Sequence, residues 1–390
     1  MPYRQTLFGV WVFKFYLWIF GKGMIAELAK EIPQDRHILI TFGGGSVRSN
    51  GVYDQVKKAL ANHRTEEFWG IEPNPKYETL MQAVKLGREK KIDFILAVGG
   101  GSVVDGSKFI AAAIPYEGDE PWELVRNHVR VTATVPLATV ITLPATGSEM
   151  NCGAVISRKS TMEKLVLSTP LNYPKFSILD PEVTFSLPKG QIAAGLIDTF
   201  IHTMEQYLTF PVDAKLMDRW AEGILQTVVE TAPRAMDVRP DYDTMANYML
   251  TATMALNDFI AMGVPQDWAT HMIGHEITAF TEITHGYTLA IVFPQLLRVM
   301  KDEKRDKILQ YGARVWGITV GSADERIEAT IDRTEMFFRS LGVKTKLSEY
   351  GVCEDIISKI VTRFEIRGTV LGENKTVTPE KVEKILTMAF

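Results

Sequence analysis

The amino-acid sequence predicts two domains of different kinds: an α/β domain with a parallel sheet over residues 1–185, and an all-helical domain over residues 186–390. In the first half, short apolar segments alternate with helix-like segments, which is the pattern of a parallel sheet flanked by helices. From Pro188 onward only amphipathic helical periodicity remains. The boundary falls near residues 180–188, where prolines break the periodicity.

The predicted strands of the first half are apolar, and each is followed by a turn. They comprise residues 36–42, 92–98 and 134–143. Helical periodicity covers residues 52–62, 77–90 and 103–113. Because the ligands of parallel sheets bind at the carboxyl ends of the strands, the three turns are candidates for a binding site.

The second half is predicted to be helical throughout. Its predicted helices comprise residues 191–207, 214–236, 242–262, 265–280, 302–315, 323–341, 354–364 and 379–388. Pro265 follows Gly263-Val264 and suits the first turn of its helix, where a missing N–H group is tolerated.

Composition excludes several classes of function. With 390 residues, the chain is longer than a single core usually allows. The net charge of −4, with no long run of one sign, gives no reason to expect a nucleic acid or an anionic membrane as partner. The two cysteines, Cys152 and Cys353, form no CxxC motif, so we expect a cytoplasmic protein in a reducing compartment.

Residues 7–20 form the most apolar stretch of the chain. The stretch is shorter than the roughly twenty residues that a membrane span needs, and Lys14 interrupts it. Its β-branched and aromatic residues predict a hairpin or edge strands. A signal peptide is the alternative.

Histidines gather in the helical half, where four of the seven lie between residues 202 and 285. Asp198 and His202 are four residues apart, as are His271 and His275, so on helices each pair shares one face. A carboxylate with imidazoles is a ligand set for Zn²⁺ or Fe²⁺. The spacing leaves open which of His271, His275 and His285 join the first pair. The HExxH motif of metalloproteases is absent, because no second histidine follows His275-Glu276 at the required distance.

The turn Gly99-Gly100-Gly101-Ser102 follows a predicted strand and opens a helix, which is where phosphate groups bind. Its spacing matches neither GxGxxG nor a P-loop, since Ser107-Lys108 reverses the required order. A tight turn without a ligand is the alternative. In the turn after the third strand, Thr142 and Thr146 could offer hydroxyl groups to phosphates or a ribose. An ordinary Pro/Gly turn is the alternative.

The first glycine run is Gly43-Gly44-Gly45-Ser46. A site for NAD usually places an acidic residue near the ribose hydroxyls, and residues 36–53 contain no Asp or Glu. Ser46 and Arg48 suit the 2′-phosphate of NADP instead. An ordinary glycine loop with a solvated Arg48 is the alternative.

These motifs together resemble the iron-containing (group III) alcohol dehydrogenases over nearly the whole chain. The most specific parts are Gly99-Gly100-Gly101-Ser102-x-x-Asp105-x-x-Lys108, Leu143-Pro144-Ala145-Thr146-Gly147-Ser148-Glu149 and the Asp198 and histidine set. Three segments resemble the branch of NADPH-dependent butanol dehydrogenases and broad-range aldehyde reductases. They are Gly43-Gly44-Gly45-Ser46, Gly70-Ile71-Glu72-Pro73-Asn74-Pro75 and Val264-Pro265-Gln266-Asp267-Trp268. Residues 1–20 depart from the family pattern because they are unusually aromatic.

The resemblance implies a dinucleotide-binding N-terminal domain, a helical metal-binding C-terminal domain, and an active site with one divalent metal ion in the cleft between them. The implied metal ligands are Asp198, His202, His271 and His285. His275 would then lie near the substrate, where it could carry a proton. The implied cofactor contacts are Gly99, Gly100, Gly101 and Ser102 at the pyrophosphate, with Asp105 of the same motif; Thr142, Leu143, Thr146 and Lys164 along the ribose and nicotinamide; and Gly43, Gly44, Gly45 and Ser46, with Arg48, at the 2′-phosphate.

The expected function is reversible hydride transfer between NADP(H) and a short- to medium-chain aldehyde such as butanal. We expect Fe²⁺ as the metal ion, with Zn²⁺ as the alternative, and a homodimer as the assembly. An NAD-dependent, glycerol-dehydrogenase-like enzyme is disfavoured because no acidic residue lies near Gly43–Arg48. A dehydroquinate-synthase-like lyase would need a basic pocket, whereas the segments around the histidines are apolar. A non-catalytic nucleotide-binding protein is disfavoured by the complete ligand set.

Overall fold

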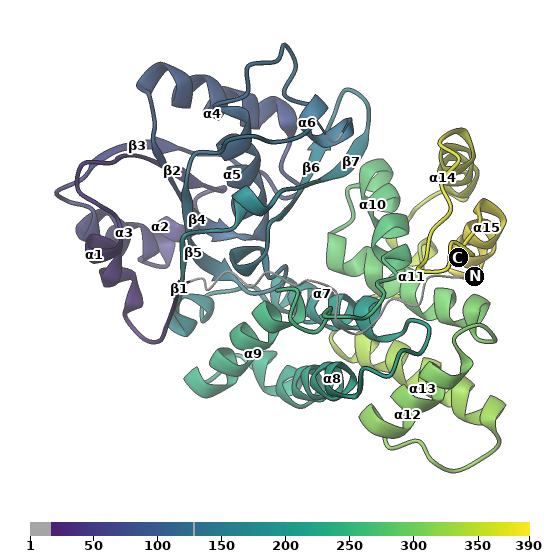
Figure 1. The fold of residues 1–390 in the computed structure, drawn as a ribbon. Helices are drawn as coiled ribbons and strands as arrows, with labels where there is room; N and C mark the ends of the chain where they lie inside the picture. Colours follow the sequence, from purple (N-terminus) through teal and green to yellow (C-terminus); the bar gives the residue numbers. More distant parts are fainter. Residues whose placement is uncertain (1–16, 128) are drawn as a thin grey trace. The chain divides into compact units, whose positions relative to one another are not determined.

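The computed structural model describes residues 17–127 and 129–390, which fall into two compact units. The sheet unit comprises residues 17–188 and 239–253, and the helical unit comprises residues 189–238 and 254–390. Figure 1 shows strands flanked by helices in the first and packed helices in the second. The predicted fold class, a parallel α/β part followed by a helical part, is confirmed. Among the described residues, no helix is long and apolar enough to cross a membrane.

Six parallel strands form the main sheet, in the order β1-β8-β5-β4-β2-β3. Their bounds are β1 (Leu17–Phe20), β2 (His37–Phe42), β3 (Arg64–Phe68), β4 (Phe94–Gly100), β5 (Leu137–Leu143) and β8 (Phe176–Leu179). The strands predicted at 36–42, 92–98 and 134–143 are β2, β4 and β5. Every residue of β2 and β8 is buried, as expected for parallel strands that are covered on both faces.

Sequence reasoning missed several strands. Charged residues in β3 concealed it, and it tolerates them because it lies at the edge of the sheet. An antiparallel hairpin, β6 (Gly153–Arg158) and β7 (Glu163–Ser168), was missed as well. At the other edge, β1 confirms an edge strand at residues 17–20. The rest of the apolar N-terminal stretch lies outside the described residues.

The helices that lie between successive strands of the sheet unit are α1 (Leu28–Glu31), α2 (Ser46–Ser49), α3 (Val52–Ala59), α4 (Tyr77–Lys90), α5 (Gly101–Ala113) and α6 (Glu123–Arg126). The unit also contains α9 (Tyr242–Ala255), which follows the last strand in the chain. The chain runs from β2 to β3 in one direction across the sheet, and from β3 through β4 to β5 in the other. Because parallel crossovers are right-handed, the helices of the two directions cover opposite faces. Accordingly, α4 and α5, which serve the second direction, pack against each other.

Helix α9 groups with the sheet, although it lies in the second half of the chain. Met249 is part of the hydrophobic core of the sheet unit. The Tyr248 hydroxyl donates to the Pro144 carbonyl oxygen at 2.5 Å, and the Thr253 hydroxyl donates to the buried Glu149 carboxylate at 2.6 Å. These contacts give α9 a place that its helical periodicity alone does not reveal.

The helical unit is organised around α7 (Lys189–Tyr207), which is buried from Ile192 to its end. Its other helices are α8 (Lys215–Ala235), α10 (Ala269–Thr281), α11 (His285–Met300), α12 (Arg305–Val315), α13 (Ala323–Ser340), α14 (Asp355–Ile366) and α15 (Pro379–Met388). On one side of α7, the Phe200 ring packs 5.6 Å from the ring of Phe338.

Several helix boundaries differ from the sequence prediction, and some helices were not predicted. Helix α10 begins at Ala269, so Pro265 lies before it and not in its first turn; Asp267 Oδ1 accepts from the Ala269 N–H at 2.9 Å and starts the helix there. Helix α9 ends at Ala255 instead of residue 262. The sequence prediction contained no helix over residues 285–300, where the structure has α11 with Pro294 in its interior.

Candidate functional site

Helix α7 supplies two of the predicted metal ligands. Asp198 and His202 lie one turn apart on the same face of α7, and both side chains are almost fully buried. The third, His271, lies in the first turn of α10, and the fourth, His285, is the first residue of α11. The four predicted ligands therefore come from three helices of one unit.

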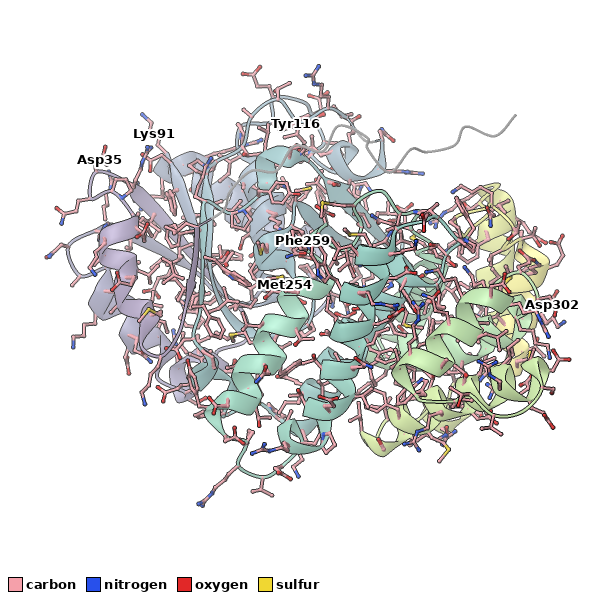
Figure 2. All side chains as sticks on the ribbon, turned by 60° about the horizontal axis from the view of Figure 1, so that its bottom comes forward. Asp35, Lys91, Tyr116, Met254, Phe259 and Asp302 are labelled. Atoms are coloured by element: carbon pink, nitrogen blue, oxygen red, sulfur yellow. The ribbon has the colours of Figure 1, made fainter. Side chains whose placement is uncertain are left out.

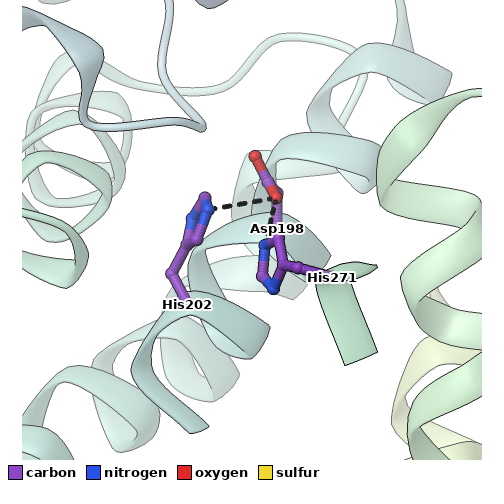
Figure 3. A group of neighbouring side chains, drawn as sticks. All are labelled: Asp198, His202 and His271. Atoms are coloured by element: carbon purple, nitrogen blue, oxygen red, sulfur yellow. Dashed lines mark ion pairs between the residues drawn. The ribbon is translucent and has the colours of Figure 1, made fainter. Parts of the chain in front are cut away.

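Three imidazole nitrogens converge on a single carboxylate oxygen. The Nε2 atoms of His202, His271 and His285 lie 3.6, 3.7 and 3.8 Å from Asp198 Oδ1. Figure 3 shows Asp198 between His202 and His271. These separations are too long for hydrogen bonds. Ligands bound tetrahedrally at about 2.1 Å from one ion lie roughly 3.4 Å apart, so the residues fit a shared divalent metal ion.

The chemistry of the donor set also fits a metal ion. Asp198, His202 and His271 offer ligand atoms within 4.8 Å of one another. The buried Nε2 atom of His271 makes no hydrogen bond to the described residues. His285 is the most open of the four, with 22% of its side chain exposed. A site with buried ligands and one more accessible side can hold an ion and still admit a small molecule.

Glycine allows the helices to approach closely enough for this convergence. A Cβ atom on Gly286 would lie 2.3 Å from the Ala194 carbonyl oxygen, so α11 can begin against α7 only with glycine at this position. A Cβ atom on Gly274 would lie 2.9 Å from Thr288 Oγ1, between α10 and α11. Gly286, next to the predicted ligand His285, thus allows α11 to begin close to α7.

Sequence reasoning missed Glu205, which contacts the predicted ligand His271. Its Oε1 accepts hydrogen bonds from the His271 N–H at 2.9 Å and from the ring Nδ1 at 3.1 Å. With its proton on Nδ1, the imidazole presents the lone pair of Nε2 to the ligand position. Burial raises the pKa of Glu205, and its hydrogen bond from His271 opposes that rise. The missed signal was spacing: Glu205 follows Asp198 by seven residues, two turns along the same face.

His275 lies beside the ligand group. Its ring centroid is 5.0 Å from that of His285 and 6.3 Å from that of His271, and the side chain is buried. The neighbouring Glu276 points elsewhere, toward Arg363 and Arg367 on and after α14, at 2.7 and 2.8 Å.

The predicted nucleotide-binding turns lie at the carboxyl ends of β2, β4 and β5. The order in which the chain adds strands reverses between β2 and β4. From β2 the chain continues to β3 at one edge of the sheet, and from β4 it continues to β5 on the other side. Such a point is where open parallel sheets bind ligands. The first two turns, Gly43–Ser46 and Gly99–Ser102, flank it.

Some of the glycines are needed for packing. A Cβ atom on Gly101 would lie 2.4 Å from the Thr146 side chain, and one on Gly99 would lie 2.5 Å from Val103. The turn after β4 therefore fits closely against the turn after β5. Gly44 and Gly45 differ from them: a Cβ atom there would meet nothing within 4 Å, and Gly45 has a φ of 106°.

Asn74 joins two of the predicted cofactor residues. Its N–H donates to Ser102 Oγ at 3.3 Å, and its side-chain oxygen accepts from Lys164 Nζ at 2.9 Å. Asp105 instead turns inward, where its carboxylate accepts from the Ser148 hydroxyl at 2.6 Å and from the Val155 N–H at 2.9 Å. This contact ties α5 to the loop after β5.

Arg48 is exposed and lies over an aromatic platform. Its guanidinium carbon is 4.0 Å from the ring centroid of Trp69 and 5.5 Å from that of Tyr53. Trp69 Nε1 and the Tyr53 hydroxyl both donate to Glu67, which also pairs with Lys57 at 2.9 Å. Within the described residues, no carboxylate forms an ion pair with Arg48 itself. A guanidinium held this way is available to an anion.

Comparison with known families identifies both halves of the chain. Residues 18–181 match the model of the iron-containing alcohol dehydrogenases, and residues 192–390 match the model of the C-terminal part of the Fe-containing alcohol dehydrogenase family. The chain is 53% identical over 374 residues to the NADPH-dependent aldehyde reductase YqhD of Escherichia coli, covering 95% of this chain and 97% of that one. It is 37% identical to the NADH-dependent butanol dehydrogenase A of Clostridium acetobutylicum, covering 95% of this chain and 97% of that one.

Solved structures agree with the sequence comparison. The crystal structure of Escherichia coli YqhD superposes with a TM-score of 0.95 at 52% identity, covering 96% of this chain and 97% of that chain. The NADH-dependent butanol dehydrogenase A of Thermotoga maritima superposes with a TM-score of 0.93 at 34% identity, covering 97% and 98%. The chain belongs to the iron-containing alcohol dehydrogenase family.

Proposed function

We propose that this protein is a metal-dependent NADP(H) alcohol dehydrogenase that reduces short- to medium-chain aldehydes such as butanal, by reversible hydride transfer. The observation that carries the proposal is the convergence of three imidazole nitrogens on Asp198 Oδ1 in a buried site. The 53% identity to a protein named as an NADPH-dependent aldehyde reductase supports the reaction.

In this proposal, the residues of the chain bind the metal ion, orient its ligands and offset part of its charge. When bound, a divalent metal ion supplies a Lewis acid for the carbonyl oxygen, and the nicotinamide supplies the hydride. Asp198, His202, His271 and His285 are the proposed ligands. One carboxylate and three neutral imidazoles would leave such a site with a single net positive charge. Glu205 holds His271 in the tautomer that leaves Nε2 available to a metal ion.

His275 is the proposed proton carrier. The centroid of its buried imidazole lies 5.0 Å from that of His285, the most open of the proposed ligands. His275 therefore lies beside the proposed metal site and is not one of its proposed ligands. An imidazole can give up and regain a proton near neutral pH. Replacing His275 with Ala should lower turnover while the metal content stays intact.

The cofactor assignment rests on the loops of the sheet unit. Gly99–Ser102 would bind the pyrophosphate at the start of α5. Thr142, Leu143, Thr146 and Lys164 would lie along the ribose and nicotinamide, and Gly43–Ser46 would meet the 2′-phosphate. Relatives are named for either NADPH or NADH. Arg48, which has no acidic ion-pair partner among the described residues, favours NADPH here. Asp105 would act indirectly, because its carboxylate is bonded to Ser148 and Val155.

We also propose Fe²⁺ as the native metal ion, a homodimer as the assembly and the cytoplasm as the location. Residues 1–185 would bind the dinucleotide, and residues 186–390 would hold the metal ion.

The test is the oxidation of NADPH with butanal, with NADH in parallel, before and after divalent metal ions are removed and restored. Metal-dependent turnover with a strong preference for NADPH is expected. Equal use of NADH would remove the 2′-phosphate assignment alone. Failure of every metal ion to restore activity with any aldehyde would overturn the dehydrogenase assignment.

A further inference from the structure

The helical unit contains a second buried cluster of charged groups, which the proposed reaction does not use. Lys304 is 6% exposed, and its Nζ lies 2.7 Å from Asp267 Oδ2 and 2.9 Å from Glu373 Oε1. Asp302, two residues earlier, is at the surface and is labelled in Figure 2. The lysine thus turns inward from the segment that joins α11 to α12.

The cluster joins four parts of the chain that are distant in sequence. Lys304 Nζ also donates to the Leu208 carbonyl oxygen at 2.7 Å, immediately after the end of α7. Asp267 lies just before α10, and Glu373 belongs to the segment between α14 and α15. One ammonium group therefore ties the end of α7 to the start of α10, with Glu373 as a second anchor.

Further hydrogen bonds connect this cluster to the proposed metal group, which consists of Asp198, His202, His271 and His285. The Asp267 N–H donates to the Glu205 carbonyl oxygen at 2.8 Å, and Asp267 Oδ1 accepts from the Ala269 N–H at 2.9 Å. The side chain of the same Glu205 accepts two hydrogen bonds from His271. From Lys304 the path runs through Asp267 to both the backbone of α7 and the first turn of α10, where His271 lies.

A buried lysine contributes little net free energy to the stability of a fold. Removing an ammonium group from water costs several kcal/mol, and apolar residues of the same size often serve stability equally well. Burial by itself would lower the pKa of Lys304, but Asp267 and Glu373 raise it, so the group stays charged. What three directed bonds provide, and an apolar contact does not, is a fixed relative position of the segments.

We propose that Lys304 is a positioning residue for the metal centre: it holds the start of α10 against the end of α7 and so sets the place of His271 relative to Asp198. This inference rests on the metal centre of the proposed function.

The experiment measures metal affinity, which a merely structural role would not change. The metal-stripped, full-length protein and its variants are titrated with Zn²⁺ against a chelator, and Co²⁺ is added separately to record the absorption bands that report coordination geometry. Lys304→Met should bind Zn²⁺ about 10- to 100-fold more weakly, the range typical for loss of a group that orients a metal ligand. Its Co²⁺ spectrum should differ from that of the wild-type protein.

Lys307→Met is the matched control. Lys307 lies on α12, is similarly buried, and pairs with Asp218 on α8 at 2.6 Å. Both variants should have a lower Tm without metal, but Lys307→Met should keep the wild-type affinity for Zn²⁺. Lys304→Met with a lowered Tm and the wild-type affinity would overturn the proposal.

Glu373→Gln keeps the contact between Lys304 and Asp267 and serves if Lys304→Met does not fold. A smaller loss of Zn²⁺ affinity in the same direction is expected, and an unchanged affinity would overturn the proposal. If the wild-type protein itself bound neither Zn²⁺ nor Co²⁺, the proposed metal centre would fail instead.

Discussion

The proposed metal group of the helical unit (Asp198, His202, His271 and His285) and the turns of the sheet unit use glycine in different ways. In the metal group, the polar side chains converge on one point, and the glycine beside them, Gly286, serves packing. In the turns, the proposed contacts with the cofactor come largely from glycines, and some of these glycines are also needed for packing. Gly99 and Gly101 are needed for close contacts, whereas Gly44 and Gly45 face open space. A glycine motif therefore says less about function than a set of convergent side chains.

Replacing Arg48 tests whether the open part of the turns binds an anion. Arg48→Gln should raise the KM for NADPH by roughly 10- to 100-fold, because hydrogen bonds to charged groups contribute about 1.5–3 kcal/mol each. The KM for NADH should not change. Steady-state kinetics with both cofactors measures this, with Arg64→Gln, an exposed arginine on β3, as the control. Equal losses with both cofactors would mean that Arg48 maintains the loop and does not choose the cofactor.

Substitutions at two glycines of the helical unit test whether Gly286 is needed for the close packing of α11 against α7. Gly286→Ala should lower the free energy of unfolding by about 1–3 kcal/mol, because its Cβ would overlap the Ala194 carbonyl group. Gly223→Ala, within α8, should raise it by about 0.5–1 kcal/mol, because a Cβ there meets nothing within 4 Å and alanine favours the helix. Urea unfolding of the metal-free proteins gives both values. Similar stabilities for the two variants would show that α11 can move away from α7.

Glu67 accepts hydrogen bonds from the Trp69 and Tyr53 side chains that lie beneath Arg48, and we expect its contribution to stability to depend on pH. Burial would raise the pKa of Glu67, but hydrogen bonds from Lys57 and Trp69 outweigh it and leave the pKa below its ordinary value of 4.5. The stability that Glu67 contributes is therefore complete above about pH 4.5 and is lost as the pH falls through the folded-state pKa. Glu67→Gln should be less stable than the wild-type protein by about 1 kcal/mol at pH 7 and equally stable at low pH. Unfolding measured across this range would contradict the expectation if the difference persisted in acid.

The sequence predicted most of this architecture because its signals are local. Strands β2, β4 and β5 are apolar runs followed by turns, and α4 and α15 match their predicted limits. Asp198 and His202 share a helix, so their spacing revealed them. His271 and His285 come from other helices, and the proposal that they bind the metal ion while His275 does not rests on the fold and on the resemblance to a known family.

Other features were beyond local signals. Strand β3 carries charges that an edge position permits, and α11 contains a proline that its packing tolerates. Glu205 acts through a tertiary contact with His271, and Lys304 looks like an ordinary surface lysine until the fold buries it. Their roles depend on which segments meet in space.

The place of α9 also has a consequence for the order of events during synthesis. The sheet unit is discontinuous in the chain, since residues 239–253 complete it after an excursion of fifty residues, 189–238, into the helical unit. A nascent chain that has reached only Pro188 lacks Met249 in its core and the Thr253 hydroxyl on the buried Glu149 carboxylate. Folding of the first unit therefore cannot be completed on the ribosome until part of the second has emerged, and a truncated protein ending at Pro188 would be an incomplete domain.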